Sequence, residues 1–216
     1  QDQVELVLMR SGEHDVARAY VLYREKRAQE RAAQAALHPA HQHVLHVVED
    51  GVTSLLDVSK IATLIESAAT GYGEEVDRAH LLDETLKNLY DGVPASEVRK
   101  STILAARALI EKDPAYSKVT ARLLLNNIRK EILGEEVSQA DMHSRYADYF
   151  PAYIKKGIQA ELLDERLGQY DLKRLGAALQ ADRDYQFEYL GLQTLYDRYF
   201  LHIEDRRIEM PQAFFM

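Results

Sequence analysis

The chain has 216 residues, of which 46% are hydrophobic and 29% are charged, and this composition is ordinary for a globular protein with one or two packed cores. Its formal net charge of −8 argues against a general nucleic-acid binder, which would normally present a basic face. Uninterrupted apolar runs are too short to span a bilayer, so we expect no membrane segment. Cysteine is absent, which excludes disulfides, thiolate zinc sites and a thiol nucleophile and fits a cytoplasmic protein.

The first part of the chain predicts two helices and a linker. Residues 2–34 show helical apolar periodicity, interrupted at Ser11-Gly12, and residues 35–43 have the composition of a linker. Four imidazoles in or just after this linker could bind a divalent metal, but no carboxylate or cysteine completes a site of defined geometry, so we predict no metal site. These imidazoles belong to His38, His41, His43 and His46.

A β-hairpin is predicted directly after the linker. An alternating run begins at Val44, a turn signal stands at Asp50-Gly51, and a second apolar run ends at Leu56. Asp-Gly between two apolar runs favours a tight hairpin, because both turn residues tolerate positive φ.

Four amphipathic helices are predicted between this hairpin and Gly134. Short polar side chains cap helix N-termini and proline suits the first turn, so each start can be recognised. We expect the second helix to end at Gly92 and the fourth at Gly134. The predicted starts are Asp57, Asp77, Ser96 and Asp113-Pro114.

After residue 135 the pattern is again mostly helical, with aromatic residues before Pro151 and a further segment from Asp171. A second hairpin is expected with its turn at Glu204-Asp205-Arg206, and a helix is expected to start at Pro211. The predicted fold class is therefore mainly α with a small β-hairpin.

The order of these elements and their residues resembles the ATP-cone, the nucleotide-sensing module at the front of ribonucleotide reductase large subunits. The resemblance implies a four-helix unit capped by a hairpin over residues 44–134. Each matching fragment alone is weakly specific, but together, in order and at the expected spacing, they are specific. The fragments are Glu49-Asp50-Gly51, residues 56–61, Tyr90-Asp91-Gly92-Val93, Ala121-Arg122-Leu123 and Ile128-Arg129-Lys130.

The flanking segments extend the resemblance to nearly the whole chain. Residues 1–34 are similar to the two C-terminal helices of another cone, so we expect a truncated first cone joined by linker 35–43 to a second cone over 44–134. Residues 135–216 resemble the helical lead-in to the reductase catalytic domain, through Asp182-Arg183-Asp184 and residues 208–212. The chain is thus identified as an N-terminal fragment of a class I ribonucleoside-diphosphate reductase large subunit.

The resemblance implies an oxidoreductase that converts ribonucleotides to deoxyribonucleotides for DNA synthesis, with ATP and dATP as allosteric effectors. Because that reaction depends on cysteines, the fragment itself is expected to be a non-catalytic regulatory region. The implied partners are other large subunits, joined through the cones, and a radical-generating small subunit, with no nucleic acid or membrane.

Two departures from the family pattern argue against nucleotide binding by the second cone. Functional cones place a Lys-Arg pair where this chain has Val48-Glu49, and a threonine where it has Ala95. An acid beside a triphosphate reverses the sign of the interaction, at a cost of several kcal/mol in a partly buried site. The candidate nucleotide-contacting residues that remain are Lys60, Arg99 and Lys130, and the alternative for both lysines is a solvated helix surface.

Two other functions stay open on the sequence, and a third is disfavoured. The chain could be a nucleotide-independent helical module for oligomerisation or interaction, or a cone of an anaerobic reductase, although the matches over residues 182–212 favour the aerobic class. A nucleotide-sensing repressor would need a four-cysteine zinc ribbon, which cannot form without cysteine.

Several remaining polar and aromatic groups are interpreted as structural. Asp141, His143 and Ser144 lie within one helical stretch, where their spacing cannot build a catalytic triad. Asp182 and Asp184 are interpreted as solvated or capping acids. Five tyrosines are interpreted as packing residues whose hydroxyl groups contact water. They are Tyr20, Tyr23, Tyr153, Tyr189 and Tyr199.

Overall fold

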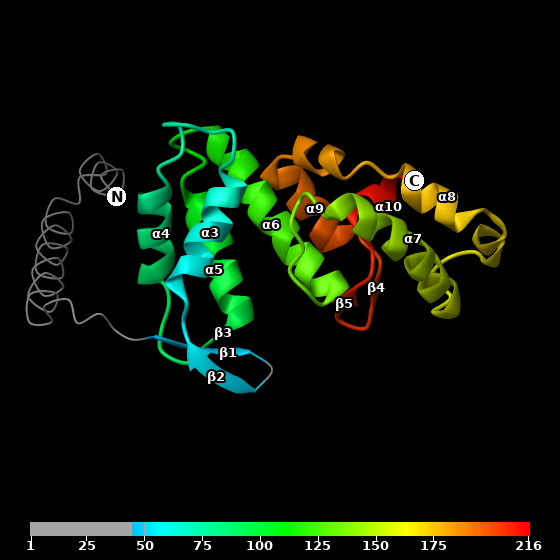
Figure 1. Cartoon of the computed structure of the whole chain (residues 1–216), viewed down its shortest axis with the longest axis horizontal. Coiled ribbons are helices and arrows are strands. Elements are labelled where there is room, and N and C mark those ends of the chain that lie inside the picture. Colours follow the sequence, from blue (N-terminus) through cyan, green and yellow to red (C-terminus); the bar gives the residue numbers. More distant parts are fainter. Residues whose placement is uncertain (1–44, 50) are drawn as a thin grey trace, which may run out of the picture. The chain divides into compact units, whose positions relative to one another are not determined.

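The computed structural model describes residues 45–49 and 51–216, which are mainly helical with two small sheets, as the sequence predicts (Figure 1). The expectations for residues 1–34, for the linker 35–43 and for its three histidines lie outside the described residues. The boundary expected between residues 134 and 135 stays a prediction.

The predicted hairpin is confirmed, and a third strand joins it. β1 (His46–Glu49) pairs antiparallel with β2 (Val52–Leu55), and Gly51 adopts a φ of +79° between them. β3 (Val93–Pro94) lies parallel to β1 on its other side, which gives the strand order β2-β1-β3. Gly92, with a φ of +76°, donates its backbone N–H to the His46 carbonyl at 3.0 Å and so starts this pairing.

The four predicted helices follow the hairpin, and two of the predicted caps have the expected geometry. They are α3 (Val58–Ala68), α4 (Arg78–Lys87), α5 (Ala95–Ala108) and α6 (Ala115–Leu133). The Asp57 carboxylate accepts a hydrogen bond from the Ser59 N–H at 3.0 Å, and that of Asp77 accepts one from the His80 N–H at 2.9 Å. Both acids therefore satisfy helix N–H groups that have no partner within the helix.

The other helix boundaries are only partly as predicted. Ser96 is not a cap, because α5 already begins at Ala95, directly after the last residue of β3. α4 ends at Lys87 and does not reach Gly92. Asp113 does act at the start of α6, accepting the Ala115 N–H at 2.8 Å, and the predicted end at Gly134 is confirmed by its φ of +80°.

The downstream region has more short elements than its pattern predicts. Pro151 lies inside α7 and does not end it, and the turn of the predicted second hairpin is Glu204-Asp205, since Arg206 already pairs with Ile203. The elements are α7 (Met142–Gln159), η1 (Glu165–Gln169), α8 (Leu172–Ala178), η2 (Ala181–Gln186), α9 (Tyr189–Arg198), β4 (His202–Ile203), β5 (Arg206–Arg207) and α10 (Pro211–Phe215).

Two hydrophobic cores hold these elements together. The first lies among α3, α4, α5 and α6 and includes Ile65, Leu81 and Leu125, each at most 1% exposed. α9 packs on α6 and adds Leu192 to this first core, as the neighbouring ribbons in Figure 1 indicate. The second core lies around α7 and includes Met142. Residues 45–216 therefore form one unit, in which α6 contacts both the helices of the first core and the downstream elements.

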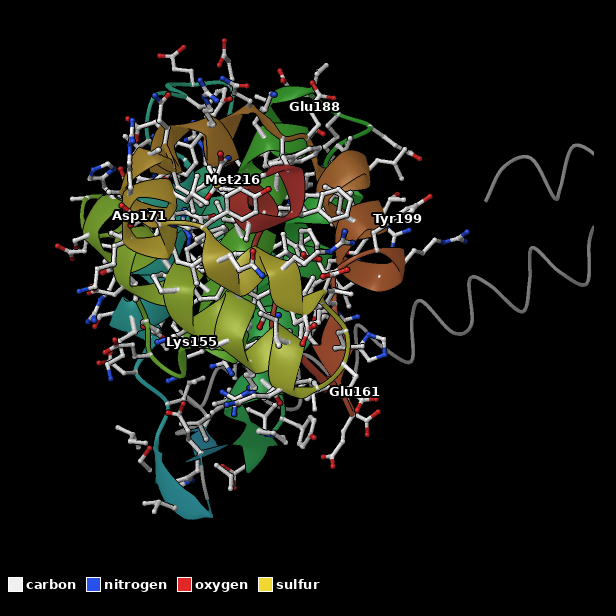
Figure 2. All side chains as sticks on the ribbon, turned by 90° about the vertical axis from the view of Figure 1, so that its right-hand side faces the viewer. Lys155, Glu161, Asp171, Glu188, Tyr199 and Met216 are labelled. Carbon is white, nitrogen blue, oxygen red and sulfur yellow. The ribbon has the colours of Figure 1, made fainter. Side chains whose placement is uncertain are left out.

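The surface of the downstream region is polar along α7 and aromatic near α9. Figure 2 looks onto this side, where Lys155 on α7 and Glu161 just after it are exposed and Tyr199 projects outward at the end of α9. Tyr199 is 57% exposed, which agrees with the expectation that its hydroxyl contacts water.

Candidate functional site

A pocket of about 430 Å³ lies beneath the first sheet and brings the three predicted site residues together. Lys60 comes from α3, Arg99 from α5 and Lys130 from the last turn of α6. Apolar side chains of α3 and α5, among them Ile61 and Val98, also line it. The pocket therefore contains the three residues that the resemblance to the ATP-cone gives as candidate nucleotide contacts.

Lys130 already has a counter-ion in this pocket. Its ammonium nitrogen lies 3.4 Å from Oε1 of Glu49, the acid that occupies the place of a cation at the end of β1. The Lys130 side chain is 26% exposed and that of Glu49 is 51% exposed, so solvent screens the pair and its contribution to stability is small. The pair places a carboxylate inside the pocket, next to Lys130.

The other two cations differ in their partners. Arg99 Nε donates to the amide oxygen of Asn127 on α6 at 3.3 Å. Lys60 follows the cap Asp57, whose pKa is held below its usual value chiefly by the Ser59 hydroxyl hydrogen bond and to a lesser extent by the Lys60 charge. Arg99 is therefore engaged by a neighbouring helix, whereas Lys60 has only a weak charge interaction with Asp57.

The balance of charge around the pocket does not favour a polyanion. Three basic side chains line it, and four acidic ones do so as well. A triphosphate is held in proteins by a surplus of Lys and Arg donors, which this lining lacks. The acidic residues are Glu49, Asp57, Glu135 and Glu136.

A second polar site, buried between α6 and the downstream helices, was missed by the sequence analysis. Asp184 is only 2% exposed, so its interpretation as a solvated or capping acid is wrong. Its carboxylate accepts hydrogen bonds from Arg129 Nη2 at 3.1 Å, the Tyr146 hydroxyl at 2.8 Å and Gln212 Nε2 at 3.0 Å. Burial raises the pKa of Asp184 above its ordinary value, against the opposing charge of Arg129 and these hydrogen bonds.

One sequence signal could have pointed to this site. Arg129 follows the buried Leu125 and Ile128 on α6 and is itself 4% exposed, so a basic residue continues an apolar helix face. A buried guanidinium requires an acidic partner, because an unpaired buried charge is costly. The identity of that partner, 55 residues later, is visible only in the fold.

The remaining predicted groups do not build a reactive site. The Ser144 hydroxyl donates to the backbone carbonyl of Asp141 at 2.8 Å, and Ser138 donates to the Asp141 carboxylate, so no triad forms. His46 Nδ1 lies 2.8 Å from the Asp91 carboxylate. Across residues 45–49 and 51–216, no group of three or more His, Asp or Glu side chains could hold a metal ion.

The tyrosine interpretation is wrong for Tyr153. Its hydroxyl is buried and donates to the carboxylate of Glu209, which is itself 5% exposed and also accepts the Leu201 N–H at 3.0 Å. Burial and this contact raise the pKa of Tyr153 well above its usual value. The tyrosine therefore anchors the segment before α10 to α7.

Within the described part of the chain, every helix is too short or too polar to traverse a bilayer.

Comparison with known proteins identifies the family. No family model matches the chain. The whole chain is 38% identical to the ribonucleoside-diphosphate reductase subunit alpha of Chlamydia muridarum (strain MoPn / Nigg) and 39% identical to that of Chlamydia trachomatis serovar D. Over 79% of its length it is 31% identical to the subunit alpha of Helicobacter pylori (strain ATCC 700392 / 26695). In all three cases the chain covers 21% of the relative.

The chain thus spans about one fifth of the length of these curated relatives. The Chlamydia matches extend over 100% of the chain, so they include both the sheet with its four helices and the downstream elements. The chain belongs to the ribonucleoside-diphosphate reductase alpha-subunit family.

Proposed function

We propose that this chain is an allosteric regulatory region of a ribonucleoside-diphosphate reductase large subunit, in which residues 44–134 form an ATP-cone that has lost nucleotide binding. The full protein would reduce ribonucleotides to deoxyribonucleotides for DNA synthesis in the cytoplasm. The chain contains no cysteine, so the reductive chemistry would belong to other parts of the subunit. The relatives' names support the diphosphate reductase over the anaerobic reductase and the repressor considered above.

The single observation that carries the loss of binding is the Glu49–Lys130 ion pair at 3.4 Å inside the pocket. A nucleotide triphosphate would have to displace Glu49 from Lys130 and then remain next to its carboxylate. With four acids and three bases around the pocket, the triphosphate gains no net attraction that offsets this displacement. ATP and dATP would therefore act on the full protein through a cone outside residues 44–134.

The role left for residues 44–134 is that of a scaffold between the sensor and the catalytic part. The proposed partners are other large subunits and the radical-generating small subunit, as in the family that the chain resembles. Allosteric control requires two sites and two global states that each ligand stabilises differently. In this proposal the residues 44–134 contribute contacts to those states and no ligand site.

The experiment uses the full-length large subunit with Lys60→Met and Lys130→Met combined. We expect the midpoint ATP concentration for activation and the midpoint dATP concentration for inhibition to change by less than about twofold, because these lysines bind no effector. The matched control replaces the exposed Lys87 and Lys100 by methionine in the same way. Each of these lysines is paired with a glutamate on its own helix. A tenfold or larger shift caused only by the pocket variant would refute the proposal.

A nucleotide-independent oligomerisation module is the second candidate function. It draws on the edge strand β2, where Val52 is 67% exposed and Leu55 is 62% exposed, since exposed apolar edge strands favour pairing with another chain. This candidate predicts that the 216-residue chain self-associates without nucleotide and that Val52→Lys makes it monomeric in sedimentation velocity. A monomer at all concentrations tested would exclude it.

A further inference from the structure

The last turn of α6 lies where the two hydrophobic cores meet. Ile128 belongs to the first core, Leu133 packs against the second, and Ile132 packs against both. The three residues between them, 129–131, have partners in three different places. Since successive helix residues point about 100° apart, one turn can reach several neighbours at once.

Arg129 ties this turn to the centre of the downstream region. Its guanidinium donates from Nη2 to Asp184 in η2 at 3.1 Å and to Gln139 at 2.8 Å. Asp184 in turn accepts the hydroxyl of Tyr146 on α7 and the amide of Gln212 on α10. One buried side chain of α6 therefore connects, directly or through one carboxylate, to three downstream elements.

Glu131 ties the same turn to the second hairpin and to α9. One carboxylate oxygen accepts the backbone N–H of Arg207 at 2.9 Å, and the other accepts the hydroxyl of Tyr196 at 2.7 Å. The Glu131 carbonyl also accepts the Arg206 side chain from Nε and Nη2, at 3.0 and 2.9 Å. The β4–β5 hairpin is thus held directly by this one residue.

Lys130, between these two anchors, lines the pocket under the first sheet and pairs with Glu49. The backbone of one helical turn moves as a rigid piece, because each peptide is fixed by the helix hydrogen bonds on either side. A movement of Lys130 with the sheet therefore displaces Arg129 and Glu131 as well.

We propose that residues 129–131 are a mechanical joint that couples opening of the first sheet to loosening of the β4–β5 hairpin and of the contacts around Asp184. The coupling is a property of the chain without any nucleotide, so it goes beyond the proposed function. Because coupling between two sites is reciprocal, a change at the first sheet alters the β4–β5 hairpin, and a change at that hairpin alters the sheet.

Hydrogen–deuterium exchange of the complete 216-residue chain, without nucleotide, tests the joint. Glu131→Ala removes the downstream anchor, and we expect the amides of residues 45–56 as well as those of 202–208 to exchange at least about threefold faster. Lys130→Met removes the pocket contact, and we expect the reciprocal acceleration at residues 202–208. Glu131 is used in place of Arg129, because removing a buried cation endangers folding itself.

Lys118→Met is the matched control. Lys118 lies on the same helix, twelve residues and about 18 Å before Lys130, and it also contacts the downstream region, donating to the Gln186 carbonyl at 2.8 Å. We expect it to speed exchange near residues 186–190 and to leave residues 45–56 unchanged. The amides of 61–65 in α3 serve as the internal reference and keep their wild-type rates in all three variants.

Two results would overturn the joint. One is that Glu131→Ala affects only residues 202–208 while Lys130→Met affects only residues 45–56, which would make the two ends independent. The other is equal acceleration of the α3 reference amides, which would mean general destabilisation and no specific coupling. Nucleotide is absent from the assay, so either result leaves the proposed loss of nucleotide binding untouched.

Discussion

At the scale of single residues, Arg129 and Asp184 form the least exposed ion pair in the described part of the chain. Both side chains are nearly fully buried, at 4% and 2% exposure, so neither charge has an alternative partner in water. Breaking such a pair by removing one member leaves the other charge uncompensated in a low-dielectric interior.

The prediction at this scale is that Arg129→Met and Asp184→Asn each lower the free energy of unfolding by about 3–5 kcal/mol. The double variant should lose less than the sum of the two, because it leaves no unpaired charge. Urea unfolding of the 216-residue chain measures both quantities. Single losses below about 1 kcal/mol, or strict additivity, would show that the pair is not coupled.

The candidate site residues were predictable only in part. Lys60, Arg99 and Lys130 come from separate helices, and the family resemblance, not periodicity, predicted that they share one pocket; the structure brings them together there. Glu49 was predicted to oppose an anion, and it lies beside Lys130. Asp184 was misread because local sequence shows a polar run, while its burial depends on Arg129 on a distant helix.

At the scale of elements, the contact between α8 and α7 leaves no room for a side chain at Gly176. A Cβ at Gly176 would lie 2.9 Å from the Ala147 carbonyl oxygen and 3.2 Å from Phe150 Cβ, both in α7. Gly191, in the first turn of α9, has no atom within 4 Å of the corresponding position. Both glycines lie in helices, but Gly176 is crowded by α7 whereas Gly191 faces open space.

The prediction is that Gly176→Ala lowers the free energy of unfolding by about 1–3 kcal/mol, as overpacking does. Gly191→Ala, its matched control, should raise that free energy by up to about 1 kcal/mol, because alanine favours a helix more than glycine does. Thermal or urea unfolding compares the two. A destabilising Gly191→Ala, or a neutral Gly176→Ala, would contradict this reading of the α7–α8 contact.

Elements with strong local signals were predicted, and elements that depend on distant partners were not. Asp50-Gly51 and the caps Asp57 and Asp77 act within a few residues, so the sequence sufficed. β3 has only two residues and exists because it pairs with β1, about 45 residues earlier, which no local pattern encodes. The same strand explains the early start of α5, since its first residue follows β3 directly.

At the scale of the whole molecule, four tyrosine hydroxyls connect elements that are far apart in the chain. Burial raises the pKa of Tyr146, Tyr149, Tyr153 and Tyr196 well above the ordinary value near 10. A group whose pKa is higher in the folded state stabilises the fold below its unfolded pKa, and that stability is lost as pH rises further.

The prediction is that stability falls as pH rises above about 10. In native protein, absorbance at 295 nm should show these four phenols ionising only together with loss of helical circular dichroism. In urea all 13 should titrate together near pH 10. Ionisation of these four phenols near pH 10 in the native protein, with the helical circular dichroism intact, would contradict their burial.

The packing of distant helices against one another was the feature least predictable from the sequence. Packing of α9 on α6 places a downstream helix in the first core, although about 60 residues separate the two elements. Apolar periodicity shows that α9 has a buried face but does not tell which helix covers it. The order of the regions was predicted from the family resemblance, whereas the contacts between their helices are visible only in the fold.

In the proposed function, the pocket under the first sheet does not hold a nucleotide triphosphate. Isothermal titration calorimetry of the 216-residue chain with ATP and with dATP tests it directly, beside a variant that combines Val48→Lys with Glu49→Arg and so replaces the acid by two cations. We expect no saturable heat from the unmodified chain at millimolar nucleotide and measurable one-to-one binding by the variant. Micromolar, one-to-one binding of either nucleotide by the unmodified chain would contradict the account.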